Sequence, residues 1–344
     1  MGSSMTKKGK SKAHNARRKP TIANSKAPKR RKLRNNEYYN LQDTFDKLYA
    51  DSKKGRVFKN LLSIISSEEN IRLAYRNIKV NKGSKTAGVD GKTIDDLKRW
   101  EDQSLIASIQ KSFEWYTPNQ VRRVEIPKGN GKTRPLGIPT IKDRLIQQCI
   151  LQVLEPICEA KFHERSNGFR PNRSAENAVA QAMTMIQQRS LHFVIDIDIK
   201  GFFENVSHGK LLKQMWAMGM REKKLICIIS RMLKAEVAGI GFPVKGTPQG
   251  GIISPLLSNI VLNELDWWIA SQWEEMPTAH EYQCNIHENG SPNRNPVYSA
   301  LRKMALKECY IVRYADDFKI FCRNRNDALK LFEAVTQWLK QRLG

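Results

Sequence analysis

The stretch CYIVRYADDFKIFC, residues 309–322, carries two adjacent aspartates between two runs of β-branched and aromatic residues. Such runs favour strands, so the stretch predicts a β-hairpin with Asp316 and Asp317 at its tip. Two neighbouring carboxylates repel each other, and a multivalent cation beside them lowers the cost of ionising both. Aspartate is also a common turn residue. The pair alone therefore leaves two interpretations open, a metal site and a polar β-turn.

A second acidic stretch, FVIDIDIKGFF at residues 193–203, lies upstream of the hairpin. In a strand, alternation puts its isoleucines on one face and Asp196 and Asp198 on the other. One face would pack against the core while the other could bind a cation. A carboxylate opposite the hairpin tip would let two metal ions, about 3.5–4 Å apart, bridge the site. The alternative is an exposed polar strand face, which is less favoured once both acidic stretches occur in one chain.

The YADD and DIKGFF segments resemble the catalytic blocks of reverse transcriptases, and specifically those of the group II intron maturase family. Four further segments resemble other blocks of that family, and they follow in the family's order. They are GVDG (88–91), IPKGNGKTRPLGIPT with a following Asp-Arg pair (126–144), SNGFRP (166–171), and GTPQGG with SPLLSN (246–259). Each segment is weak evidence alone, but the ordered set is specific.

The resemblance implies an α+β fold, the fingers and palm of a right-hand polymerase, with an antiparallel palm sheet packed on helices. We expect a disordered basic arm over residues 1–35, beginning with a four-residue cloning remnant, then an N-terminal helical extension over 36–115. Fingers over 116–190 and palm over 191–344 would follow. A polar stretch at about 271–300 is expected to be an irregular insertion. Because the chain ends at Gly344, we expect a fragment that stops before the family's thumb and polymerises poorly.

The resemblance assigns catalysis to three aspartates, Asp198, Asp316 and Asp317, as ligands of two Mg²⁺ ions. One ion would activate the primer 3′-hydroxyl and the other would hold the triphosphate. Asp198 is preferred to Asp196 because the family's aspartate directly precedes Ile-Lys-Gly-Phe-Phe. Asp196 is then expected to take no part in the chemistry.

Four residues are expected to bind the incoming nucleotide by the same resemblance. Phe202 would lie under the sugar and exclude a 2′-hydroxyl, while Phe203 would face the core. Lys128 and Arg134, on the two arms of the fingers turn, would hold the triphosphate, although a solvated charged hairpin is the alternative. Gln249 would line the same pocket, on a turn whose glycines permit close backbone approach.

Three further residues are candidates for primer or template contacts. Tyr314 would lie beside the primer terminus. Arg170 and Arg173 are assigned to template or intron RNA on weaker grounds, and another role for these arginines is left open.

Charge is concentrated at the N-terminus of this strongly basic chain. The formal net charge is +25, and residues 1–34 hold thirteen Lys or Arg and no acidic residue. Such a segment cannot bury a core, so we expect an arm that becomes ordered on an anionic partner. An RNA-binding arm is favoured, with a solubilising tail and an organelle transit peptide as alternatives. Its expected RNA contacts are Arg17, Arg18, Lys19, Lys29, Arg30, Arg31 and Lys32.

Secondary structure follows from hydrophobic periodicity over most of the chain. Helices are expected in segments 40–79, 94–113, 141–162, 174–188, 210–233 and 328–343 and after Pro255, with strands at 121–127 and 193–199.

Cysteine usage and hydropathy suggest a location. The six cysteines are scattered singly, without the spacing of a disulfide framework or zinc ribbon, and no apolar run reaches the length of a membrane span. We therefore expect no membrane and a reducing compartment, preferably a bacterial cytoplasm, with an organelle as alternative. His280, Cys284 and His287 have zinc-like spacing but no clear fourth ligand, so a flexible surface loop is favoured.

The leading functional expectation is an RNA-directed DNA polymerase and intron maturase that binds its group II intron RNA, assists splicing and copies RNA into DNA for retrohoming. Its partners would be intron RNA, an RNA template with a DNA primer, dNTP and, in the full-length protein, target DNA; a homodimer is left open. One alternative is the reverse transcriptase of a retron, a diversity-generating or a phage-defence system. Another is a non-catalytic RNA-binding splicing cofactor.

Overall fold

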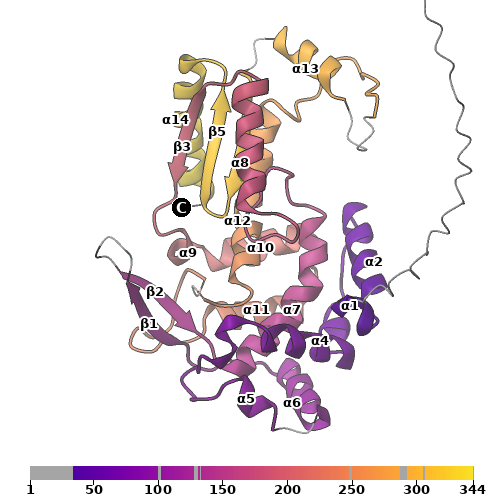
Figure 1. The fold of residues 1–344 in the computed structure, drawn as a ribbon, viewed down its shortest axis with the longest axis vertical. Coiled ribbons are helices and arrows are strands. Elements are labelled where there is room, and N and C mark those ends of the chain that lie inside the picture. The colour runs from indigo at the N-terminus through magenta and orange to yellow at the C-terminus, as the bar shows by residue number, and fades with distance from the viewer. Residues whose placement is uncertain are drawn as a thin grey trace, which may run out of the picture.

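The computed structural model describes residues 34–99, 102–127, 131, 133–247, 250–286, 293–304 and 307–343. Figure 1 shows two lobes, one built around a three-stranded sheet and one built mainly of helices. We call them the sheet lobe and the helical lobe. Helices packed on small antiparallel sheets confirm the expected α+β class.

The helical lobe is organised around α7 (Ile141–Glu159), which is buried on nearly every side. Most of its buried side chains are apolar, and buried polar ones such as Asp143 and Gln152 are hydrogen-bonded. Helices α2 and α4 pack along it. The neighbouring elements are α1 (Asn35–Tyr38), α2 (Gln42–Lys53), α3 (Leu62–Ile65), α4 (Glu68–Lys79), η1 (Lys82–Lys85), α5 (Ile94–Leu97), α6 (Asp102–Glu114) and α11 (Lys223–Leu233). The helical expectations for these segments are confirmed.

A hairpin projects from the side of this lobe, below α9 in the view of Figure 1. Its antiparallel strands are β1 (Arg122–Pro127) and β2 (Thr133–Ile138), with Ile126 opposite Arg134. The GVDG segment packs where the hairpin meets α7, because a Cβ at Gly88 would lie 2.7 Å from the Cα of Thr140. Two segments of the expected blocks are therefore in direct backbone contact.

The sheet lobe contains β3 (Phe193–Asp198), β4 (Cys309–Tyr314) and β5 (Asp317–Cys322), in the order β3-β5-β4. Both pairings are antiparallel. The strands expected at 193–199 and on either side of the YADD tip are confirmed. Because β5 is central, the hairpin strand that starts at Asp317 lies beside the strand that ends at Asp198.

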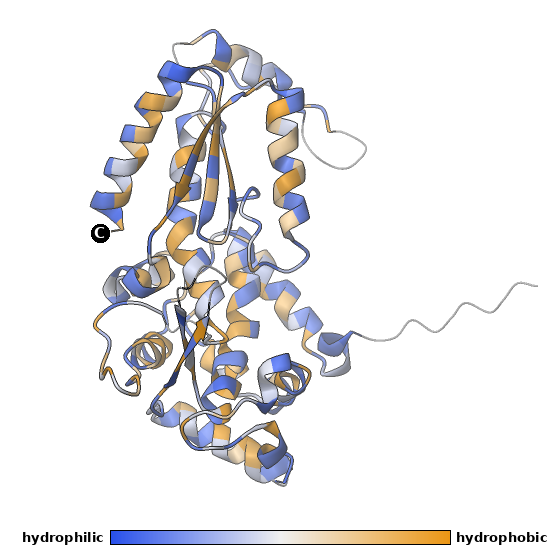
Figure 2. Ribbon diagram, turned by 60° about the vertical axis from the view of Figure 1, so that its left-hand side comes forward, coloured by the Kyte–Doolittle hydropathy of each residue, from blue (hydrophilic) through white to orange (hydrophobic). Residues whose placement is uncertain are grey.

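Helices cover the two faces of this sheet unequally. Helices α12 (Ser254–Gln272) and α14 (Arg325–Arg342) pack on one face, while α8 (Ala175–Met183) packs against β4 on the other. In Figure 2 the sheet lies between α14 and α8. The acidic residues of β3 are exposed, whereas Ile195 is 6% exposed, which confirms the expected alternation. The face with the aspartates is thus left open beside β3.

Shorter elements complete the fold. Within the sheet lobe η2 (Thr184–Gln188) continues α8 toward β3, while α9 (Phe202–Asn205) and α10 (His208–Ala217) follow β3 toward the helical lobe. The segment expected to be an irregular insertion is only partly irregular, because α13 (Asn295–Arg302) lies at its end and buries Tyr298 and Leu301. Within the residues that the structure describes, no helix is both long and apolar enough to cross a membrane.

Candidate active site

The tip of the YADD hairpin is a two-residue turn. Tyr314 ends β4, Asp317 begins β5, and the two are paired across the turn. Ala315 has φ of +59°, in the left-handed region that a residue with a Cβ seldom adopts. Such a conformation costs about 1–3 kcal/mol and persists only where surrounding contacts impose it. The turn therefore depends on what lies beneath it.

Arg313 supplies the contacts beneath the turn. Its side chain is fully buried, and so is Asp266 on α12, to which it donates at 2.6 and 2.8 Å. Its Nη1 also donates to the carbonyl of Ala315 at 2.7 Å and to Oδ1 of Asn259 at 3.0 Å. One guanidinium thus ties the strained turn to α12.

The SNGFRP segment packs against the other side of the turn. The amide of Asn167 donates to the Arg313 carbonyl at 2.8 Å, and Asn259 Nδ2 donates to the Gly168 carbonyl at 2.8 Å. A Cβ at Gly168 would lie 2.1 Å from the Ala315 amide nitrogen. Only glycine fits there, so three separate sequence blocks meet at the YADD turn.

Asp198 and Asp317 are direct cross-strand partners on the open face of the sheet. Directly opposed residues have Cβ atoms roughly 4.5–5.5 Å apart, and like charges there destabilise a sheet. Asp316 occupies the turn beside them and is partly exposed. The structure therefore brings together the three aspartates that the sequence singled out.

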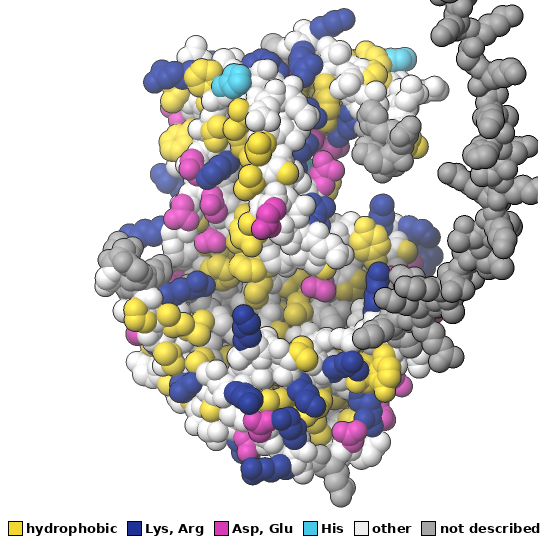
Figure 3. Space-filling model, viewed as in Figure 1, with side chains coloured by type: hydrophobic (Ala, Val, Ile, Leu, Met, Phe, Trp, Pro, Cys, Tyr) yellow, Lys and Arg dark blue, Asp and Glu magenta, His cyan; other side chains and the backbone are white. Residues whose placement is uncertain are grey.

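Lys319 lies on the same face, opposite Asp196. Its Nζ donates to Oδ1 of Asp196 at 2.7 Å and to Oδ1 of Asp317 at 3.3 Å. The hydrogen bond that it donates to Asp196, with a smaller contribution from the one to Asp317, raises the pKa of the Lys319 ammonium. Figure 3 shows acidic side chains with a basic one among them on this face of the sheet lobe.

The donor set fits a hard divalent cation, because carboxylate oxygens are the ligands that Mg²⁺ prefers. Among the described residues, however, no group of three or more His, Cys, Asp or Glu side chains stands close enough to hold a metal ion as placed. The backbone brings Asp198, Asp316 and Asp317 close together, and their side chains would have to turn toward a common ion to bind it.

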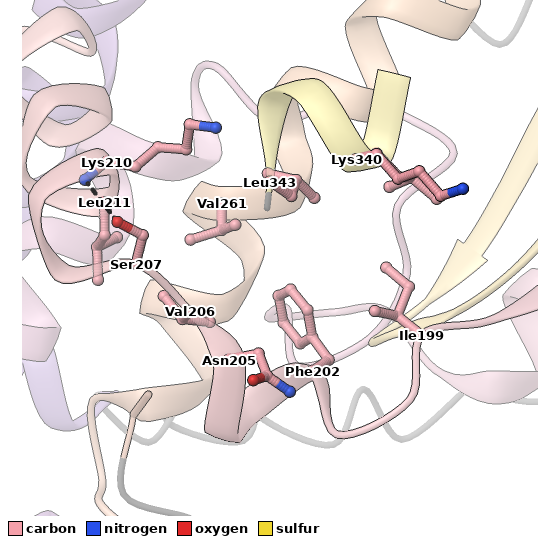
Figure 4. A pocket seen from close by; sticks show the side chains of 11 residues that line it. Ile199, Phe202, Asn205, Val206, Ser207, Lys210, Leu211, Val261, Lys340 and Leu343 are labelled. Atoms are coloured by element: carbon pink, nitrogen blue, oxygen red, sulfur yellow. Dashed lines mark hydrogen bonds between the residues drawn. The ribbon is translucent and has the colours of Figure 1, made fainter. Parts of the chain in front are cut away.

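The two phenylalanines of DIKGFF are placed differently from expectation. Gly201, with φ of +61°, turns the chain from β3 into α9. The Phe202 ring is 5% exposed and lines an apolar cavity of about 160 Å³ with Val261 and Leu343 (Figure 4). Phe203 is the more exposed ring, and its carbonyl accepts from the Thr247 amide at 2.7 Å. Burial therefore does not favour Phe202 under a nucleotide sugar, and Phe203 adjoins the GTPQGG block.

The GTPQGG block is wedged between the fingers hairpin and α9. A Cβ at Gly250 would lie 2.5 Å from the Gly137 carbonyl of β2, and one at Gly246 would lie 2.9 Å from the Glu204 carbonyl. A pocket of about 340 Å³ between them is lined by residues including Leu136 and Thr247. Arg134 lies exposed on β2. Lys128 and Gln249 lie outside the described residues.

Arg170 has a structural role that the sequence analysis did not assign. Its side chain is 8% exposed, and all three guanidinium nitrogens donate, to Glu159 and to the carbonyls of His163 and Ser166. Because this guanidinium is already bound within the protein, the structure favours a structural role for Arg170 over a contact with template or intron RNA. Arg173 is half-buried beside it and donates to the Glu164 carbonyl.

The remaining sequence candidates are only partly described. Tyr314 is 41% exposed beside Asp317, as a primer contact requires. The arm residues, 17–19 and 29–32, lie outside the described residues. Of the zinc-like set, His287 also lies outside them, while the Cys284 thiol contacts the Tyr282 carbonyl.

Sequence reasoning missed Arg313, Asp266 and Lys319. Strand alternation could have found the first, because Arg313 falls on the inward face of β4 with Ile311 and therefore needs a buried anion. Asp266 follows Asn259 by seven residues, which puts both on one face of a helix. No local signal identifies Asp266 as the partner, since the pairing joins different elements.

Comparison with known proteins identifies the family. Residues 126–343 match the family model described as "Reverse transcriptase (RNA-dependent DNA polymerase)". The chain is 34% identical over 278 residues to protein YkfC of Escherichia coli (strain K12), a match covering 77% of this chain and 71% of YkfC. It is 36% identical over 217 residues to the group II intron-encoded protein LtrA of Lactococcus lactis subsp. cremoris, covering 62% of this chain and 35% of LtrA.

A third relative is the putative COX1/OXI3 intron 2 protein of Saccharomyces cerevisiae, which is 26% identical over 326 residues, covering 85% of this chain and 37% of that protein. The chain thus spans just over a third of the length of the two intron proteins. Because the matched residues include the YADD hairpin, the aspartate strand and β2 of the fingers hairpin, this chain belongs to the reverse transcriptase family, among the enzymes related to group II intron-encoded proteins.

Proposed function

We propose that this chain catalyses RNA-templated DNA synthesis with Asp198, Asp316 and Asp317 as the ligands of two Mg²⁺ ions. The observation that carries the proposal is the register that sets Asp198 directly opposite Asp317, next to Asp316, on the open face of the sheet. Mg²⁺ bound there would supply positive charge to the primer 3′-hydroxyl and to the triphosphate. The buried Arg313 keeps the turn that presents two of the ligands in one geometry.

The surroundings supply the rest of the polymerase site. Tyr314 is exposed beside Asp317, where a primer terminus would lie. Arg134, with Lys128 and Gln249, would hold and orient the dNTP triphosphate from the fingers hairpin and the adjoining GTPQGG turn. We assign selection against the 2′-hydroxyl to Phe203 in place of Phe202, because Phe203 is the more exposed ring and contacts that turn.

The test is primer extension on an RNA template with dNTPs. Asp198→Asn and Asp317→Asn should each lower the rate by at least a hundredfold, whereas Glu333→Gln, an exposed acid on α14, should leave it unchanged. Phe203→Val should admit ribonucleotides, while Phe202→Val should lower stability without changing sugar selection. Extension that survives both aspartate changes would exclude the proposed site.

We further propose that the chain acts as a maturase, binding the group II intron RNA that encodes it, assisting its splicing and, in a full-length protein, copying RNA at a target DNA for retrohoming. The names of the relatives and the basic arm support this. Binding to the cognate intron's stem-loop, compared with an unrelated RNA of equal length over a salt series, tests it. Preference that persists at high salt is expected, while equal and steeply salt-dependent binding would leave only nonspecific phosphate contacts.

Two alternatives remain distinguishable by experiment. Changing Asp316 and Asp317 to Ala distinguishes a non-catalytic splicing cofactor, which would be indifferent to the change, from a polymerase, which would lose all DNA synthesis. A retron, diversity-generating or phage-defence enzyme would polymerise but show no preference for an intron. The domain limits given above, a cytoplasmic location and a homodimer stay proposals.

A further inference from the structure

Four charged residues form a square on the open face of the sheet. Asp198 is opposite Asp317, and one step further along the strands Asp196 is opposite Lys319. Since alternate residues of a strand share a face, all four side chains project to the same side. Three negative charges and one positive charge therefore share one surface, with Asp316 at the nearby turn.

Lys319 contacts an aspartate of each cross-strand pair, Asp196 and Asp317. Its Nζ lies 2.7 Å from Asp196 and 3.3 Å from Asp317, and these distances are short enough for ion pairs. Asp317 is also a proposed metal ligand. An ammonium group and a metal ion would thus compete for the same carboxylate.

Asp196 is the nearer partner of the lysine. The ion pair Lys319–Asp196 is shorter than the ion pair Lys319–Asp317, so the ammonium lies closer to Asp196 than to the proposed metal ligand. Without Asp196 the ammonium would be free to approach Asp317 fully. The lysine side chain is 40% exposed and has room to move.

We propose that Lys319 is a built-in counter-ion that competes with the metal for Asp317, and that Asp196 is a positioning residue that weakens this competition. The inference rests on the proposed function, because it needs a metal at Asp317. Before metal binds, the ammonium offsets the repulsion between Asp198 and Asp317. When metal binds, Asp196 retains the ammonium and frees the ligand.

The test measures metal affinity directly, with the whole chain, Mn²⁺ and no nucleic acid, by electron paramagnetic resonance or calorimetry. Lys319→Met should bind Mn²⁺ about 3–10-fold more tightly than the unaltered chain, since the competitor is gone. Asp196→Asn should bind it about 3–10-fold more weakly. Lys330→Met, an exposed lysine on α14, is the matched control for net charge and should change nothing.

The double variant separates this mechanism from general electrostatics. If Asp196 acts through the lysine, Asp196→Asn should have little effect in the Lys319→Met background. Equal effects of Asp196→Asn in both backgrounds would overturn the positioning role. Unchanged or weaker affinity in Lys319→Met would overturn the counter-ion role.

Asp317→Asn separates failure of this inference from failure of the proposed function. If Asp317→Asn abolishes the Mn²⁺ signal while Lys319→Met leaves it unchanged, the metal site stands and only the role of Lys319 is refuted. If Asp317→Asn leaves binding unchanged, the metal site and the role of Lys319 both fail. Far-ultraviolet circular dichroism of each variant checks that it is folded.

Discussion

Replacement of Arg313 by Met should strongly destabilise the protein. The change leaves the Asp266 carboxylate, 1% exposed, without its guanidinium partner, and it removes the donors to Asn259 and Ala315. Breaking a buried ion pair by removing one partner costs about 3–5 kcal/mol. That is a large share of the roughly 5–15 kcal/mol by which proteins are stable.

The assay is urea unfolding followed by circular dichroism, with Arg56→Met as control. Arg56 also pairs with an aspartate, Asp51, but its side chain is 64% exposed, so its loss should cost less than about 1 kcal/mol. The double change Arg313→Met with Asp266→Leu leaves no unpaired charge. It should recover most of the lost stability.

Recovered stability should not restore the site in this double variant. The Ala315 carbonyl would still lack its donor, so the left-handed turn would be less well held and metal affinity should remain low. A loss below about 1 kcal/mol for Arg313→Met would refute the reasoning about the buried pair. A stable double variant with full metal affinity would refute the link between Arg313 and the turn.

Three further predictions follow from buried contacts elsewhere. Arg170→Gln should cost about 3 kcal/mol in urea unfolding and leave RNA affinity unchanged, because Arg170 binds Glu159; lost affinity at full stability would contradict this. Gly168→Ala should abolish primer extension, because its Cβ would meet the Ala315 amide at 2.1 Å, whereas Gly209→Ala, with open space around it, should be tolerated; equal activity of both variants would refute the close approach. Burial, with a smaller contribution from Glu159, raises the pKa of Glu155 from 4.5 to about 7, so the native state holds its proton more tightly than the unfolded chain, and stability falls as pH rises from 4.5 to about 7. Glu155→Gln should therefore raise the free energy of unfolding by roughly 1–3 kcal/mol at about pH 8, seen as a higher melting temperature, and should not raise it at about pH 4; no gain at the higher pH would contradict this.

The local character of each segment could be predicted from the sequence. The YADD hairpin, the acidic face of β3 and the long buried helix α7 all follow from side-chain period, because period depends only on backbone geometry within one element. Period put Asp196 and Asp198 together on one strand face, and the resemblance to a family's blocks then selected Asp198, Asp316 and Asp317 and supplied the chemistry.

Residue roles that depend on contacts between elements could not be predicted from the sequence in this way. Arg170 was assigned to template or intron RNA on weak grounds, yet its guanidinium donates to Glu159 and to two backbone carbonyls. Phe202 and Phe203 are neighbours in sequence, and which ring is buried depends on the left-handed turn at Gly201 and on packing against Leu343.

The sequence by itself determined which residues can carry the chemistry: two acidic segments, a basic N-terminus and a set of glycines at turns. The tertiary structure decided which of them meet. Asp198 faces Asp317 and Lys319 faces Asp196 because β5 pairs with β3 in one register. Arg313 of β4 reaches Asp266 because the sheet packs on α12. These pairings join residues that are distant in the chain, and no local pattern specifies a partner across that distance, since partner choice results from burying the apolar faces of several elements together.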